Sequence, residues 1–345
     1  MIAGVFEQHD KSRFETFAIS IGPNDHSQTR ARIEAAAERF VDAREMPDAA
    51  ASRLIHELQI DIMVDLNGYT GNSRTAILAS HPAPVQVNFL GYPGTMAAPH
   101  IDYVIADRII VPEARQKWFA EKVVYLADCY QPNDRKRVVP GKPPSRRDAN
   151  LPEHGFVFCC FNNNYKIAPE IFSGWMRLLG ATEGSALWLL ADNGAAADNL
   201  RREAHARGVS PERLIFAPRT SPEAHLARHA LADLALDTLP YNAHTTATDA
   251  LWMGVPLVTC PGTSFQSRVA ASILTACGMP ELITGSLTEY ETLALRLAHE
   301  TSLLAATRAQ LAANRDSSSL FDIARFTRNL EAAYLRMYRK AEASA

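Results

Sequence analysis

Short apolar runs alternate with amphipathic segments along most of the chain. A short apolar run between turn formers predicts a buried strand, and apolar positions three and four apart predict a helix that packs on a sheet. The first part of the chain shows strand patterns at 14–20, 61–66, 85–90, 103–106 and 122–126, with a Glu- and Ala-rich helical segment after residue 20 and helices over 49–58 and up to Ser80. This alternation predicts a parallel α/β domain.

The same alternation continues in the second part of the chain. It predicts strands at 156–161, 187–190, 214–216, 234–236 and 256–259, and helices at 169–179, 197–207 and 222–229. One face of the first of these helices is apolar and consists of Ile171, Phe172, Trp175, Met176 and Leu179. We therefore expect a second doubly wound domain, whose ligand lies beyond the carboxyl ends of the strands. The loops expected at that edge are 162–166, 219–222 and 240–246.

A polar segment separates the two patterns. Residues 131–152 contain several arginines and lysines together with Pro132, Pro140, Pro143, Pro144 and Pro152. Such a composition is typical of a linker. We expect one domain over 1–130, the linker over 131–152, a second domain over 153–320 and a C-terminal helix over 321–345. The apolar stripe of that helix is interpreted as core and consists of Phe326, Leu330, Tyr334, Leu335 and Tyr338.

The stretch 237–256 carries the most chemistry. Thr245 and Thr246 fall where a helix should begin after a buried strand, so free backbone N–H groups and two hydroxyls would point at one spot that suits a phosphate. His244 can add a donor, and the Asp249 carboxylate can accept hydrogen bonds from a ribose diol. The alternative is a simple N-capping threonine with a helical aspartate for the dipole.

Three basic side chains are expected at the same edge. Lys166 lies between a strand and a helix, where it can neutralise a diphosphate, although a lysine at such a place is often only a surface charge. His225 and Arg228 are three residues apart on a predicted helix, so they share a face. They can frame a base or a phosphate, or they can be an exposed pair without function.

Composition excludes several classes of protein. The chain has 345 residues, a net charge of -3 and no long basic block, which argues against nucleic acid as a main partner. The five cysteines have no regular spacing, which favours a reducing compartment. No apolar run approaches about 18 residues and no signal peptide is visible, so we expect no membrane partner and a cytoplasmic location.

Metal and dinucleotide motifs are missing from the sequence. It contains no Asp-x-Asp triplet, and the acidic residues Asp233, Asp237 and Asp249 are too scattered for a magnesium cage. Neither G-x-G-x-x-G nor G-x-x-x-x-G-K-[ST] occurs. We therefore expect no cofactor and no metal, and a transfer that relies on fixed cations and helix dipoles.

Four motifs in order resemble the catalytic region of the O-linked N-acetylglucosamine transferase family, including its plant SPINDLY-type members. The motifs cover 82–95, 161–169, 242–256 and 267–272. The resemblance implies a GT-B fold, in which two Rossmann-like domains face a cleft and the second binds the donor nucleotide.

The resemblance also implies a role for each matched residue. Lys166 would meet the diphosphate as a catalytic residue, with Tyr165 also in the catalytic set. His244, Thr245 and Thr246 would hold the diphosphate from the helix end, and Asp249 would bind the ribose. The remaining implied contacts are His225 and Arg228 near uracil and diphosphate, Asn163 and Tyr165 in the donor pocket, and Leu90 and Gly91 against the sugar.

The implied reaction is inverting, metal-independent transfer of a sugar to a protein Ser or Thr hydroxyl, with UDP-GlcNAc as the expected donor. Two alternatives remain open. One keeps the fold and uses GDP-fucose or UDP-glucose, or a glycan or Asn amide as acceptor. The other is a non-catalytic module that binds a nucleotide sugar or a partner protein.

The chain departs from the family pattern at three points. Family members begin this region with a strand and a His-Pro loop. This sequence starts after them, and its residues Met1 to Phe6 match the helix that follows the loop. Losing a central strand would leave two unpaired edges, so we expect an isolated chain that is poorly stable or inactive. The helical repeats that family members usually carry upstream, and that are their usual platform for the protein acceptor, are absent from this sequence. We expect such repeats as a possible partner in a longer protein. Pro222 and Tyr241 replace residue types found near the donor in the animal enzymes, which leaves the identity of the sugar open.

Overall fold

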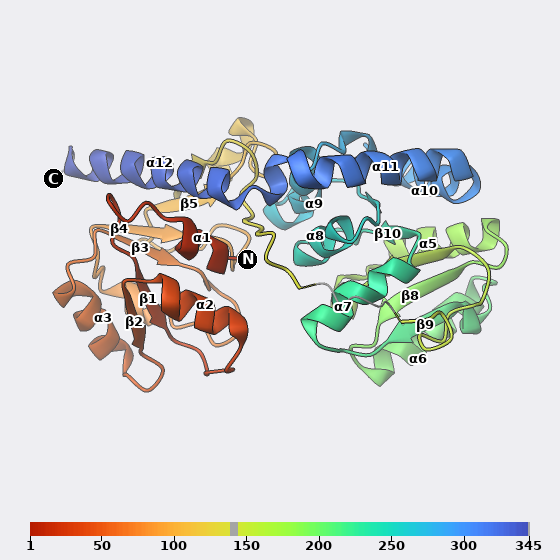
Figure 1. Ribbon diagram of the computed structural model, residues 1–345, viewed down its shortest axis with the longest axis horizontal. Helices are drawn as coiled ribbons and strands as arrows, with labels where there is room; N and C mark the ends of the chain where they lie inside the picture. Colours follow the sequence, from red (N-terminus) through yellow and green to blue (C-terminus); the bar gives the residue numbers. More distant parts are fainter. Residues whose placement is uncertain (139–143, 344–345) are drawn as a thin grey trace. The chain divides into compact units, whose positions relative to one another are not determined.

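The chain forms two compact units in the computed structural model, which describes residues 1–138 and 144–343. Unit 1 comprises Met1–Arg135 and Ser319–Ala345, and unit 2 comprises Lys136–Ser318 (Figure 1). The C-terminal helix α12 (Ile323–Glu342) groups with unit 1, where it packs on α1 (Ala3–Gln8). Pro140 and Pro143 of the expected linker lie outside the described residues, and the domain boundaries inferred from the sequence stay a prediction.

Unit 1 is an α/β unit with two parallel sheets. One sheet has the order β1-β2 and the other β3-β4-β5-β6. The strands are β1 (Phe17–Ser20), β2 (Arg39–Asp42), β3 (Ile62–Asp65), β4 (Val85–Asn88), β5 (Tyr103–Ala106) and β6 (Lys122–Tyr125). The helices that alternate with them are α2 (Gln28–Ala36), α3 (Asp48–Glu57), α4 (Ala76–Ala79) and the 3-10 helix η1 (Glu113–Trp118). The expected strands are present, and β2 is a strand that the apolar pattern did not reveal.

The two sheets of unit 1 share a hydrophobic cluster. Ile19 of β1 and Met63 of β3 both pack against buried Ala51, Ile55 and Ile77. β1 pairs only with β2, and β3 pairs only with β4 among the described strands. β1 and β3 are therefore both edge strands, as the family resemblance implied, and side chains rather than backbone hydrogen bonds join the two sheets.

Unit 2 contains one parallel sheet with the strand order β11-β10-β7-β8-β9. Its strands are β7 (Val157–Cys160), β8 (Ala186–Leu190), β9 (Leu214–Ala217), β10 (Leu234–Leu236) and β11 (Leu257–Val258). The helices are α5 (Pro169–Ala181), α6 (Gly194–Ala206), α7 (Pro222–Arg228), α8 (Thr245–Trp252), α9 (Val269–Ala276), α10 (Leu287–His299) and α11 (Thr301–Ser317). The expected doubly wound sheet is confirmed.

The strand order of unit 2 locates its ligand edge. The chain runs outward from β7 to β9 and then returns to the other side of β7 to form β10 and β11. The order therefore reverses between β7 and β10, and ligands of doubly wound sheets bind beyond the carboxyl ends of the strands at such a point. All five apolar residues predicted for one face of α5 are buried, and α5 packs on α10.

Candidate functional site

Helix α8 begins at Thr245, as the sequence predicted. Its N-cap is His244, and no side chain caps the helix, so the alternative of an N-capping threonine is wrong. Among the described residues, none accepts a hydrogen bond from the backbone N–H of Thr245 or Thr246. These N–H groups carry the positive end of the helix dipole, which makes the start of α8 suitable for an anion.

Lys166 lies beside the loop that leads into α8. It ends the 3-10 helix η2 (Asn164–Lys166), which follows β7. Its Nζ donates to the Asn242 carbonyl oxygen at 3.0 Å and lies 4.0 Å from the centre of the Tyr241 ring. Burial lowers the pKa of the Lys166 ammonium to about 8. Lys166 is thus a partly buried cation held by this loop, and the alternative of an ordinary surface charge is wrong.

Asn162 joins the same two segments, although the sequence did not single it out. Its Nδ2 donates to Thr238 Oγ1 at 2.8 Å, and its Oδ1 accepts from Thr246 Oγ1 at 2.5 Å. This buried amide therefore ties the end of β7 to the loop after β10 and to the first turn of α8. The signal available in the sequence was the Asn run that begins at position 162.

His244 is a neutral ring in this arrangement. Burial lowers its pKa to about 3, and the nearby Lys166 charge acts in the same direction. The His244 Nε2 lies 3.4 Å from the Gln266 carbonyl oxygen, and the ring stacks on Tyr241. Because a carbonyl oxygen only accepts, Nε2 carries the proton in this contact. Positive charge at the start of α8 therefore comes from Lys166 and the helix dipole rather than from an imidazolium.

Asp249 lies one turn further into α8 and contacts two basic side chains. Its Oδ1 pairs with Arg137 Nη1 at 2.5 Å, and its Oδ2 is 3.8 Å from His225 Nε2. Burial raises the pKa of Asp249, and Arg137 offsets part of that shift. Arg137 belongs to a short basic run that carried no site prediction, so the sequence did not reveal this contact.

His225 and Arg228 of α7 meet around one aromatic ring. The His225 ring packs edge-on against Phe161 at 5.3 Å between centroids, and the Arg228 guanidinium lies 5.2 Å from the centre of the same ring. Arg228 is 6% exposed, and its Nη1 donates to the Pro218 carbonyl oxygen. Burial, aided by Arg228, lowers the pKa of His225 to about 4. The pair is therefore not exposed, and its role near the base and the diphosphate stays a prediction.

Asn163 and Tyr165 lie nearer the solvent. The Asn163 Oδ1 accepts from Arg219 Nη2 at 3.0 Å, and its Nδ2 is 3.4 Å from the Tyr165 hydroxyl. Tyr165 is 71% exposed. Both follow β7 at the ligand edge of the sheet, and their roles in the donor pocket and in catalysis stay predictions.

Leu90 and Gly91 belong to unit 1, in the loop after β4. Leu90 has a φ of 73°, in the left-handed region. A Cβ atom on Gly91 would lie 2.1 Å from the Leu66 carbonyl oxygen, so only glycine lets the two loops after β3 and β4 approach this closely. Their expected contact with the sugar stays a prediction.

We expect Gly91→Ala to destabilise unit 1 by about 2 kcal/mol or more, because the methyl group would overlap a backbone carbonyl that has to shift. Gly94→Ala is the matched control, since its Cβ would meet only the Tyr92 ring at 3.6 Å. Hydrogen exchange of peptides that cover β3 and β4 measures this unit separately. Equal protection in the two variants would contradict the close approach at Gly91.

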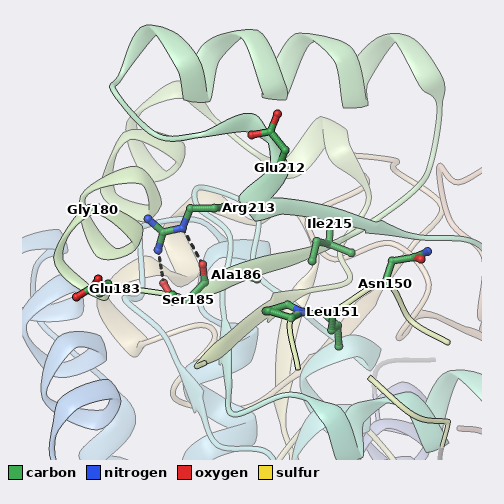
Figure 2. Close-up of a pocket in the computed structure, with 11 residues that line it drawn as sticks. Asn150, Leu151, Gly180, Glu183, Ser185, Ala186, Glu212, Arg213 and Ile215 are labelled. Atoms are coloured by element: carbon green, nitrogen blue, oxygen red, sulfur yellow. Dashed lines mark hydrogen bonds between the residues drawn. The ribbon is translucent and has the colours of Figure 1, made fainter. Parts of the chain in front are cut away.

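A hollow of about 670 Å³ lies at the opposite edge of unit 2, next to the first residues of β8 and β9 (Figure 2). Its arginine, Arg213, donates to Ser185 at both the carbonyl and the hydroxyl oxygen and also to the carbonyl oxygens of Leu179 and Thr182. The guanidinium therefore holds the turn before β8 together. The hollow lies away from the carboxyl ends of the strands and is not our candidate donor site.

The described residues also bear on metal and membrane binding. No group of three or more His, Cys, Asp and Glu side chains in 1–138 and 144–343 is arranged to hold a metal ion. Within the same residues, every helix is too short or too polar to cross a membrane.

Comparisons with known proteins identify the family of the chain. The chain is 39% identical over 344 residues to a probable UDP-N-acetylglucosamine–peptide N-acetylglucosaminyltransferase, SEC, of Arabidopsis thaliana, covering 98% of the chain and 35% of that protein. It is 28% identical to the Caenorhabditis elegans UDP-N-acetylglucosamine–peptide N-acetylglucosaminyltransferase, covering 97% of the chain and 39% of the relative. The chain thus spans somewhat more than a third of the length of these relatives.

Solved structures show the same fold. A mutant O-GlcNAc transferase of Thermobaculum terrenum superposes with a TM-score of 0.92 at 33% identity, over 100% of this chain and 65% of that one. Anabaena HepE in complex with UDP and glucose has a TM-score of 0.63 at 13% identity, over 97% and 95% of the two chains, and supports the fold alone. The architecture is the expected GT-B type, with a Rossmann-like fold in each unit. Since the model of glycosyl transferase family 41 also matches residues 1–142 and 143–330, the chain belongs to glycosyl transferase family 41.

Proposed function

We propose that unit 2 binds UDP-GlcNAc and that the protein transfers GlcNAc from it to Ser or Thr hydroxyls of proteins. The observation that carries this proposal is the convergence of the Lys166 ammonium with the start of α8 at the carboxyl ends of β7 and β10. An ammonium and two backbone N–H groups at a helix start form a site for a diphosphate. The names of the relatives support the choice of sugar and acceptor.

The neighbouring side chains supply contacts for the rest of the nucleotide. Asp249 lies one turn beyond the helix start, where its carboxylate can accept hydrogen bonds from the ribose hydroxyls. His225, on the Phe161 ring, is a neutral group suited to packing near a base. In this proposal Asn163 and Tyr165 line the outer side of the donor.

In the proposed reaction an acceptor hydroxyl oxygen attacks the anomeric carbon of GlcNAc and inverts it. The bond from that carbon to the diphosphate oxygen breaks, UDP leaves with the electron pair, and the hydroxyl proton passes to a base. Negative charge develops on the leaving phosphate, where Lys166 and the helix dipole stabilise it. We propose that these fixed charges replace a metal ion in this role.

Calorimetric titration with UDP, UDP-GlcNAc and GDP-fucose tests the proposal. We expect micromolar affinity for the uridine nucleotides, about -8 kcal/mol, weak binding of GDP-fucose, and no change when EDTA is present. A folded chain that binds no nucleotide would refute the donor site. Preference for GDP-fucose would favour the alternative donor, and binding without transfer of labelled GlcNAc to an extract of unmodified proteins would favour a binding module.

A further inference from the structure

A buried carboxylate lies beneath the loop that leads into α8. Asp237 follows β10 and is fully buried. Its Oδ1 accepts from the backbone N–H of Thr238 at 2.8 Å and of Ala243 at 2.6 Å, and its Oδ2 accepts from Thr259 Oγ1 at 2.5 Å. Burying a carboxylate is costly unless hydrogen bonds and an opposite charge compensate it. The hydrogen bonds are present, and the opposite charge is Lys166.

One peptide group connects the two charges. The peptide that joins Asn242 to Ala243 donates its N–H to Asp237 and accepts at its carbonyl oxygen from Lys166 Nζ at 3.0 Å. The anion and the cation therefore polarise the same peptide from its two ends. Hydrogen bonds to ionised groups are stronger than neutral ones, and a chain of them in a buried site strengthens each member.

The other titratable groups around this pair are neutral near pH 7. Burial raises the pKa of the Cys160 thiol to about 12, raises the pKa values of Cys260 and Tyr290, and lowers the pKa of His244 to about 3. Burial also raises the pKa of Asp237 to about 7 and lowers that of Lys166 to about 8, and each of these two charges opposes the shift of the other.

We propose that Asp237 is a positioning residue of the donor site: acting through the peptide between Asn242 and Ala243, it is the buried counter-charge that holds the Lys166 ammonium toward the start of α8. This inference rests on the proposed function, because it assigns Asp237 a task only if Lys166 meets the donor diphosphate. It goes further by assigning the control of the Lys166 charge to Asp237, a side chain that is fully buried behind the loop.

The test is the affinity for UDP-GlcNAc between about pH 6 and about pH 10. The wild-type midpoint is read above about pH 7, where Asp237, with a pKa of about 7, is ionised and Lys166, with a pKa of about 8, titrates. The donor diphosphate does not titrate there. Binding that depends on charged Lys166 is present below its pKa and is lost as pH rises above it, so wild-type affinity should fall above about pH 8. In Asp237→Asn, which keeps the shape but removes the charge, we expect the midpoint of this fall to move down by about one pH unit.

Two further variants make the result decisive. Lys166→Ala should abolish the fall, which identifies the titrating group. Thr259→Val removes a hydrogen bond from Asp237 and raises the pKa of its carboxyl, so it should shift the midpoint in the same direction by a smaller amount. It decides the question if Asp237→Asn does not fold.

A purely structural role for Asp237 predicts a different result. Affinity would then drop at every pH without a shift of the midpoint, and an unmoved midpoint in the folded variants would overturn the inference. Failure of the proposed function looks different again, because the wild-type chain itself would then bind no UDP-GlcNAc.

Discussion

Lys166→Ala is expected to reduce GlcNAc transfer at least about 100-fold, the loss typical of removing one preorganised donor from a developing negative charge. Lys166 is a partly buried cation whose Nζ contacts the Asn242 carbonyl and the Tyr241 ring, so its charge is held in a fixed position. The measurement is the initial rate of transfer from labelled UDP-GlcNAc to an extract of unmodified proteins, at saturating donor.

The matched control is Arg202→Ala. This change removes a positive charge from the exposed face of α6, which belongs to unit 2 like Lys166. It should leave the rate within about twofold of wild type, as surface substitutions usually have small effects. Lys166→Arg separates charge from shape, since a planar guanidinium does not fit a site built for a compact ammonium. Equal, measurable rates in the wild type and in Lys166→Ala would remove Lys166 from the proposed reaction.

The second large effect is expected at Asp249. A ribose hydroxyl bonded to a carboxylate contributes about 1.5–3 kcal/mol, so wild-type protein should bind UDP roughly 10- to 100-fold more tightly than 2′,3′-dideoxy-UDP. In Asp249→Ala the two nucleotides should bind almost equally. Calorimetric titration of both proteins with both nucleotides forms a double-mutant cycle that isolates this contact.

The ratio of the two affinities is the informative quantity here. Removing Asp249 also takes a partner from Arg137, and this arginine can then attract the diphosphate of either nucleotide. That effect cancels in the ratio. Asp198→Ala, an exposed carboxylate on α6, should keep the wild-type preference. A preference that survives in Asp249→Ala would place the ribose elsewhere.

Local periodicity explains why much of the fold was predictable. The strands of unit 2 and the buried face of α5 follow from apolar runs and from a three- and four-residue spacing, which depend only on neighbours in the sequence. β2 was missed because it holds only two apolar residues, Phe40 and Val41, between the charged Arg39 and Asp42. A short edge strand of this kind has no apolar run to reveal it.

The candidate site, too, was predictable from the sequence only in part. The sequence by itself determined that α8 starts at Thr245, that Lys166 follows a strand and that both lie at one edge of a doubly wound sheet, because each of these depends on local pattern and on the chain order of strands. Only the tertiary structure decided that Arg137 meets Asp249, 112 positions away, and that Asp237 and Lys166 share one peptide group. Such contacts depend on which distant segments fold together, and the same folding sets the burial that shifts the pKa values of Lys166 and Asp237.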